Sequence, residues 1–157
     1  MPSPYLLSSS TVVQAPLDVA FAGVLDAPLE ELFPHRAGVI PPIKECTGQD
    51  GAWDTVGKSR TVVLQDGTSN LETLVEYSKP NNYRYQLSDF TGPMKGLVAG
   101  VYGQFSFVPE GNGTRVTWSW KITATNPIAR TMLPVVGFFW RRYAAGMWPL
   151  YAARLSA

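Results

Sequence analysis

The chain has 157 residues, with 13 lysines and arginines against 12 aspartates and glutamates, and a formal net charge of +1. There is no basic excess to neutralise phosphates, so we expect no nucleic-acid partner. Cys46 is the only cysteine, which excludes an internal disulfide framework and a cysteine-rich zinc site.

The amino terminus lacks the basic and apolar regions of a secretory signal. No apolar run reaches the roughly 18 residues that a membrane span requires. We therefore expect a cytoplasmic protein without stable membrane insertion. Residues 1–7 are expected to be loosely held, and residues 8–157 to form a single domain.

The first predicted strand covers residues 8–16, a short segment with several β-branched residues that ends at a proline. Residues 15–28 then carry apolar side chains at helical spacing, with an aspartate in the first turn, and predict a helix. Residues 29–34 predict a second, shorter helix.

From residue 43 to residue 125 the apolar pattern changes to the two-residue period of β-strands. The segments are separated by turns rich in glycine, asparagine and proline, which are typical of antiparallel hairpins. The predicted strands cover residues 43–49, 56–65, 69–78, 82–90, 98–109 and 114–125. Consecutive antiparallel strands of this kind predict a meander.

Residues 127–155 return to the helical period, with Asn126 as the expected N-cap. One side of a helical wheel is apolar, and arginines lie on the other. This pattern favours a water-facing amphipathic helix over a membrane anchor, with bends near Pro134 and Pro149. Phe138 and Trp148 fall toward the arginine side, where they would favour contact with a second subunit or with a bilayer surface.

The element order predicts an α+β fold. A curved seven-stranded antiparallel sheet would wrap around a long C-terminal helix, with two short helices after the first strand. Such an arrangement tends to leave a void between the sheet and the helix.

Two motifs carry a family resemblance. Residues 57–77 follow the pattern G..R.....DG....E....Y, and residues 109–118 read P.GNGTRVTW. The sequence resembles the START-like, or SRPBCC, superfamily, which includes polyketide cyclase/dehydrase-type proteins. The resemblance implies a helix-grip fold whose C-terminal helix closes a deep cavity, and either binding of lipids, sterols, hormones or polyketides or, in some members, cyclase or dehydratase activity.

Arg60 and Glu72 lie on the two strands that flank the Asp66–Gly67 turn. If Val62 faces inward, Arg60 faces inward too. Glu72 shares that face only if the loop is a three-residue Asp-Gly-Thr loop with a bulge, whereas a two-residue turn points it the other way. The resemblance implies that an inward pair anchors the polar group of a ligand, and the alternative is an exposed salt bridge.

The strand at 114–125 alternates cleanly and turns Trp118 and Trp120 inward. In the strand at 98–109 the alternation leaves two registers open, one with Tyr102 inward and one with Phe105 inward. We predict a ligand site between the sheet and the C-terminal helix. The predicted ligand-binding residues are Arg60, Val62, Leu64, Glu72, Leu74, Tyr85, Tyr102, Trp118, Trp120, Val136, Phe139, Trp140, Tyr143 and Met147.

The favoured function is binding of a small hydrophobic or amphipathic molecule by a monomer or a homodimer. The alternative is a cyclase or dehydratase with Glu72 as base, Arg60 as oxyanion stabiliser and a tyrosine as acid. A single histidine, His35, gives no metal site, and we expect no cofactor. The glycine-rich segment 91–100 is expected to be either a mobile loop at the cavity mouth or a plain connector.

Overall fold

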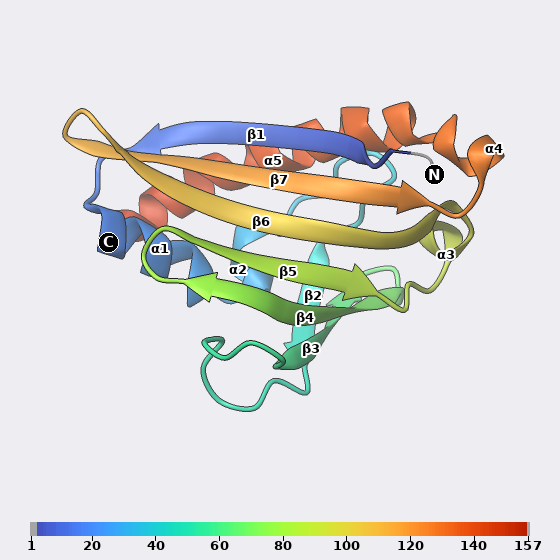
Figure 1. Ribbon diagram of the computed structural model, residues 1–157, viewed down its shortest axis with the longest axis horizontal. Coiled ribbons are helices and arrows are strands. Elements are labelled where there is room, and N and C mark those ends of the chain that lie inside the picture. The colour runs from blue at the N-terminus through green and yellow to red at the C-terminus, as the bar shows by residue number, and fades with distance from the viewer. Residues whose placement is uncertain (1–2, 157) are drawn as a thin grey trace.

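The computed structural model describes residues 3–156, and the expectation for residues 1 and 2 lies outside the described residues. One antiparallel sheet of seven strands has the order β1-β7-β6-β5-β4-β3-β2 (Figure 1). The strands are β1 (Tyr5–Val13), β2 (Ile43–Thr47), β3 (Ser59–Leu64), β4 (Ser69–Ser78), β5 (Asn82–Ser88), β6 (Val98–Glu110) and β7 (Gly113–Ala124). The helices are α1 (Leu17–Leu25), α2 (Leu29–Leu32), α3 (Pro93–Leu97), α4 (Pro127–Arg130) and α5 (Leu133–Leu155).

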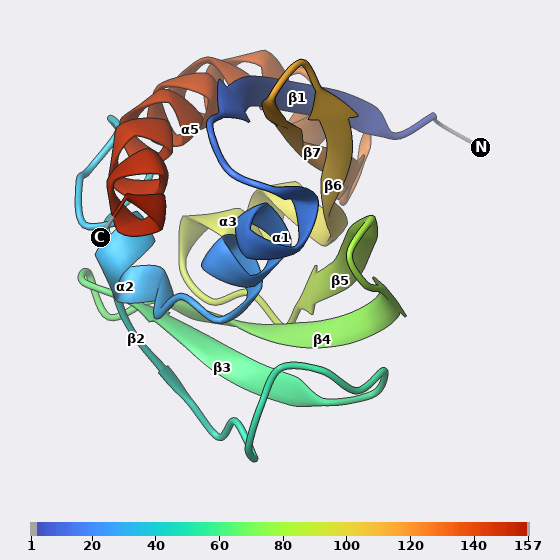
Figure 2. The same ribbon diagram turned by 90° about the vertical axis from the view of Figure 1, so that its left-hand side faces the viewer.

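The sheet curls around the helices, and α5 lies across its open side (Figure 2). Each strand from β2 to β6 pairs with the next one in the chain, and β1 forms the other edge of the sheet by pairing with β7. The predicted α+β class, the curved seven-stranded sheet and the two short helices after the first strand are confirmed.

The first strand begins at Tyr5, three residues before its predicted start. Tyr5 pairs with Ile122 of β7, and the side chain of Leu7 is buried. The expectation of a loosely held segment is therefore wrong for Tyr5–Leu7.

The segment predicted as one helix over 127–155 is two helices, with a break at Thr131–Met132. Asn126 caps α4 by accepting a hydrogen bond from the amide of Ala129 at 2.7 Å, as predicted. Pro134 lies in the first turn of α5. Backbone N–H groups in the first turn have no acceptor within the helix, so the missing N–H of proline costs no hydrogen bond. The helix continues through Pro149.

The β1 strand covers a side of α5 that the helical wheel had assigned to the surface. Trp148 is buried there, and its Nε1 donates to Ser9 Oγ at 2.9 Å. The placement of Trp148 toward the outside is therefore wrong, whereas Phe138 is about half exposed, as the wheel indicates. Within residues 3–156, no helix combines the length and the hydropathy that crossing a bilayer requires.

Candidate functional site

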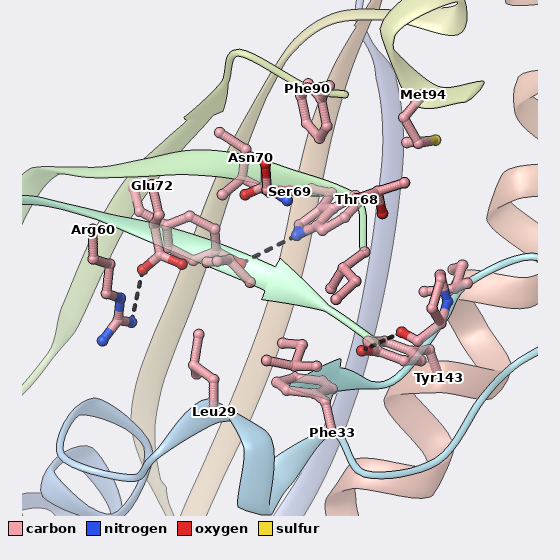
Figure 3. Close-up of a pocket in the computed structure, with 18 of the residues that line it drawn as sticks. Leu29, Phe33, Arg60, Thr68, Ser69, Asn70, Glu72, Phe90, Met94 and Tyr143 are labelled. Carbon is pink, nitrogen blue, oxygen red and sulfur yellow. Dashed lines mark hydrogen bonds and ion pairs between the residues drawn. The ribbon is translucent and has the colours of Figure 1, made fainter. Parts of the chain in front are cut away.

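A cavity of about 140 Å³ lies between the inner face of the sheet and α5. Its walls come from the sheet, from α2 with the segment after it, and from α5 (Figure 3). The predicted residues that line it are Arg60, Val62, Leu64, Glu72, Tyr85, Trp118, Trp120, Val136 and Tyr143. Most of these side chains are apolar or aromatic, and few polar groups face the space.

The remaining predicted residues lie elsewhere. Leu74, Trp140 and Met147 are buried in the solid core, because alternation gives the side of a sheet or helix but not how far the cavity reaches along it. Phe139 lies against Gly38 rather than the cavity. Tyr102 is on the outer face and 46% exposed.

The open register of β6 is settled with Phe105 inward. Phe105 pairs with Trp118 across the β6–β7 ladder, and their rings stack with centroids 5.6 Å apart. Phe105 lines the cavity together with Tyr83 and Leu87, which share the inward face of β5 with Tyr85. The two-residue period of β5 was the signal that pointed to Tyr83 and Leu87.

Several lining residues come from segments without periodicity, which sequence patterns do not reveal. Leu29 and Phe33 form part of the wall on the α2 side. The Phe33 ring stacks on Tyr143 at a centroid distance of 4.9 Å, and Tyr143 Oη donates to the carbonyl of Pro41 at 3.1 Å. This contact fixes the 39–41 segment against α5 at one edge of the cavity.

The glycine-rich segment 91–100 contributes Thr91 and Met94 to the cavity wall. It contains the short helix α3, which the sequence did not predict. Figure 3 shows Phe90 and Met94 on the side of the cavity opposite Leu29 and Phe33. The segment therefore lies at the cavity rather than serving only as a remote connector.

Arg60 and Glu72 face each other directly across β3 and β4. Arg60 Nη2 donates to Glu72 Oε2 at 2.8 Å, and both side chains are about 93% shielded from water. The amide of Leu64 donates to the carbonyl of Thr68 at 2.8 Å, so the pairing extends one residue beyond the strands and leaves a three-residue loop, 65–67, with Gly67 at φ +88°. With this loop length Arg60 and Glu72 share a face. This loop length matches the predicted condition, although the loop lies one residue earlier than Asp-Gly-Thr.

The Arg60 guanidinium is held on two further sides. Its Nη1 donates to Gln49 Oε1 at 2.9 Å, and its carbon lies 4.1 Å from the centroid of the Trp53 ring. Burial raises the pKa of Glu72 and Arg60 opposes that shift. Burial lowers the pKa of Arg60, but the neighbouring Glu72 carboxylate raises it, and the net result is a pKa above the ordinary value.

Arg60 also separates the cavity from a second recess. Arg60 and Leu29 line both spaces. The second recess lies beneath the α1–α2 connection and the loop that carries Trp53, and two carboxylates, Asp26 and Glu30, contribute to its wall. The Arg60–Glu72 ion pair therefore lies between the two spaces, at one end of a mainly apolar cavity.

Tyr85 forms a second polar point in the wall. Its hydroxyl oxygen accepts Trp118 Nε1 at 2.8 Å and Trp120 Nε1 at 3.1 Å. Its ring lies over Gly103, its partner on β6, where an added Cβ would come 2.1 Å from the ring. Gly103 therefore provides the space that the tyrosine occupies.

Other candidate groups stay outside the cavity lining. His35 is exposed at the end of the α2 segment. Cys46 is half-buried, and burial raises the pKa of its thiol to about 11, which disfavours the reactive thiolate. Among residues 3–156, no three His, Cys, Asp or Glu side chains cluster closely enough to hold a metal ion.

The buried tyrosines predict a loss of stability at alkaline pH. Burial raises the pKa of Tyr83, Tyr85, Tyr143 and Tyr151. In the unfolded chain tyrosine ionises near pH 10, so above that pH the folded state binds more protons than the unfolded state. Their contribution is complete below about pH 10 and is lost as the pH rises toward the folded values.

We therefore expect the midpoint of thermal unfolding to fall steeply above about pH 10. Circular dichroism melts between pH 8 and pH 11.5 measure it. A variant with Tyr102→Phe, which removes an exposed tyrosine, provides the control and should show the same fall. A flat midpoint across this range would show that these hydroxyls are not protected from water.

Comparison with known proteins agrees with the architecture. The family model described as polyketide cyclase / dehydrase and lipid transport matches residues 6–152. No curated protein matches the sequence.

Solved structures similar to the chain cover nearly its whole length. A major latex-like protein 151 from Panax ginseng has a TM-score of 0.72 at 13% identity over 97% of both chains. A START superfamily protein from Mycobacterium smegmatis has a TM-score of 0.69 at 13% identity, over 96% of this chain and 97% of that one. Ara h 8.0201 has a TM-score of 0.68 at 15% identity, over 98% and 99%. At these identities the likeness shows the fold alone.

Proposed function

The chain belongs to the family described as polyketide cyclase / dehydrase and lipid transport, and within it we propose that this protein binds a small hydrophobic or amphipathic molecule in the cavity between the sheet and α5. The lipid, sterol and polyketide-like classes are the candidates. The observation that carries the proposal is an apolar cavity with a small number of polar groups at fixed positions.

The wall chemistry supports an apolar body for the ligand. Phe33, Phe105, Trp118 and Tyr143 present ring faces or edges to one connected space. Aromatic side chains bury a large area at a low cost in conformational entropy, which suits a site that takes up an apolar molecule. A cavity of about 140 Å³ is on the order of those that hold a single aromatic ring, so a longer ligand would extend beyond this space.

The polar groups support an amphipathic ligand. Arg60 binds one carboxylate oxygen of Glu72 and leaves the other oxygen without a partner among residues 3–156. We propose that this pair anchors a hydroxyl or carbonyl group of the ligand. Val62 and Leu64 continue the same strand face as apolar wall.

We favour binding over the cyclase or dehydratase alternative. Catalysis would use Glu72 as base and Arg60 as oxyanion stabiliser, but the two are bonded to each other at 2.8 Å. Either group would have to leave its partner inside a low-dielectric site to act on a substrate, which costs free energy. We also propose that the protein acts in the cytoplasm, because the half-buried free thiol of Cys46 fits a reducing compartment. We propose that it acts there as a monomer or a homodimer.

Binding is tested by titrating the delipidated protein with dodecanoic acid, cholesterol and naringenin while tryptophan fluorescence is followed. We expect a saturable change with at least one probe, because Trp118 and Trp120 line the cavity. Val136→Phe, which fills the cavity from α5, should weaken that binding about tenfold or more. Val135→Phe is the matched control, since Val135 is the preceding residue of α5 and its side chain is 46% exposed.

Two outcomes contradict the proposal. One is the absence of any saturable change with all three probes. The other is an equal affinity in the Val136→Phe and Val135→Phe variants, which would place the bound molecule outside the cavity.

A further inference from the structure

One hydroxyl in the cavity wall has already used its capacity to accept hydrogen bonds. Tyr85 lines the cavity and is 6% exposed. Its oxygen accepts Trp118 Nε1 at 2.8 Å and Trp120 Nε1 at 3.1 Å. A hydroxyl oxygen has two lone pairs and one proton. Both lone pairs are therefore occupied, and only the proton is left for a further hydrogen bond.

The direction of this network cannot reverse. An indole nitrogen donates and does not accept, so Tyr85 cannot turn its proton toward either tryptophan. Among residues 3–156, the structure gives the Tyr85 hydroxyl no acceptor. Burial also raises the pKa of Tyr85, which keeps the hydroxyl protonated at neutral pH.

The hydroxyl is also held in place. The Trp118 ring lies parallel to Phe105 at 5.6 Å and packs on Trp140 at 4.6 Å, so its N–H direction is fixed. The Tyr85 ring rests on Gly103, where even a methyl group has no room. A rigid donor without a partner beside an apolar cavity is a group that a bound molecule can satisfy.

We infer that the Tyr85 hydroxyl donates a hydrogen bond to the bound molecule, so that the cavity selects ligands with an oxygen or nitrogen acceptor over ligands of the same shape that carry only a donor. Ketones, esters and aza-aromatic rings belong to the first class, and N–H heterocycles belong to the second. The inference rests on the proposed function, because it concerns the same cavity. The selection comes mainly from rejection, since a donor-only ligand leaves the hydroxyl proton unpaired in a buried place.

Quinoline and indole test this inference. The two have similar size and apolar area, but quinoline offers only an acceptor and indole only an N–H donor. In the wild-type protein, calorimetry is expected to give quinoline a dissociation constant about tenfold lower than that of indole, the difference that one satisfied hydrogen bond makes.

Trp120→Phe frees one lone pair of Tyr85, which then can accept from a ligand. The preference for quinoline should fall toward one in this variant. Trp148→Phe is the matched control, because it removes an indole that donates to Ser9 outside the cavity. The tenfold preference should persist there.

The outcomes separate this inference from the proposed function. Equal binding of quinoline and indole by the wild type, or a preference that Trp120→Phe leaves unchanged, would overturn the donor role of Tyr85 while leaving a binding cavity in place. Failure of both probes, together with dodecanoic acid, cholesterol and naringenin, would overturn the proposed function and this inference with it.

Discussion

Replacing Arg60 with methionine is expected to destabilise the protein by about 3–5 kcal/mol. The substitution keeps an unbranched side chain of similar length but leaves the Glu72 carboxylate without its partner. Glu72 is only 5% exposed, so water cannot replace the lost guanidinium. The variant also loses the Gln49 hydrogen bond and the packing on Trp53.

The loss is expected to depend on pH in a defined direction. Without Arg60, burial alone acts on Glu72 and raises its pKa further, so the buried group prefers the neutral form. The deficit is then smallest below the ordinary glutamate pKa of about 4.3, where only the pH-independent loss of the Gln49 and Trp53 contacts remains. It grows as the pH rises from there toward the folded value. Urea unfolding of both proteins at pH 4, 5.5 and 7 measures this deficit.

Two controls identify burial as the cause. The double variant Arg60→Met/Glu72→Leu removes both charges and is expected to regain most of the stability, because an apolar pair needs no partner. Arg115→Met breaks the pair with Glu110, which has the same 2.8 Å N–O distance but is nearly half exposed, and should have little measurable effect. A double variant as unstable as Arg60→Met would show that the charge of Glu72 is not the source of the cost.

Replacing Gly103 with alanine is expected to destabilise the protein by about 3 kcal/mol, at the upper end for an added methyl group in a packed site. The new Cβ would lie 2.1 and 2.3 Å from two ring carbons of Tyr85 and 2.4 Å from its hydroxyl oxygen. That ring cannot move aside easily, because both Trp118 and Trp120 bond its hydroxyl. The backbone itself tolerates a side chain here, so the cost comes from the ring alone.

A double-mutant cycle with Tyr85→Ala tests this contact. In the Tyr85→Ala background the alanine at 103 has free space, and its cost is expected to disappear. Gly100→Ala is the matched control in the same strand, since a Cβ added there would lie 3.8 Å from the nearest atom, the carbonyl oxygen of Leu87. A cost that persists without the Tyr85 ring would contradict the proposed contact.

The inward positions of this site could be predicted wherever one face of a strand is plainly apolar. Trp118 and Trp120 follow from alternation alone, because the opposite positions of their strand are polar. In β6 both alternating sets contain large aromatic residues, and only the pairing of Phe105 with Trp118 settles the register. Alternation had no means of deciding it.

Other features depend on geometry that no periodic pattern encodes. Glu72 shares a face with Arg60 because the hairpin loop has three residues, and the positive φ of Gly67 decides this. Trp148 is buried because β1, from the far end of the chain, packs along α5. Leu29 and Phe33 enter the wall from short or irregular segments, where side-chain direction follows from tertiary packing.

Anomalous diffraction from crystals soaked with 4-iodoacetophenone tests most directly whether a small amphipathic molecule occupies this cavity. The account predicts an iodine peak between the sheet and α5, in the space lined by Phe33, Trp118 and Tyr143, with the ketone oxygen within hydrogen-bond distance of Tyr85 Oη. An iodine peak found only on the outer surface, in crystals whose protein binds the same compound in solution, would contradict it.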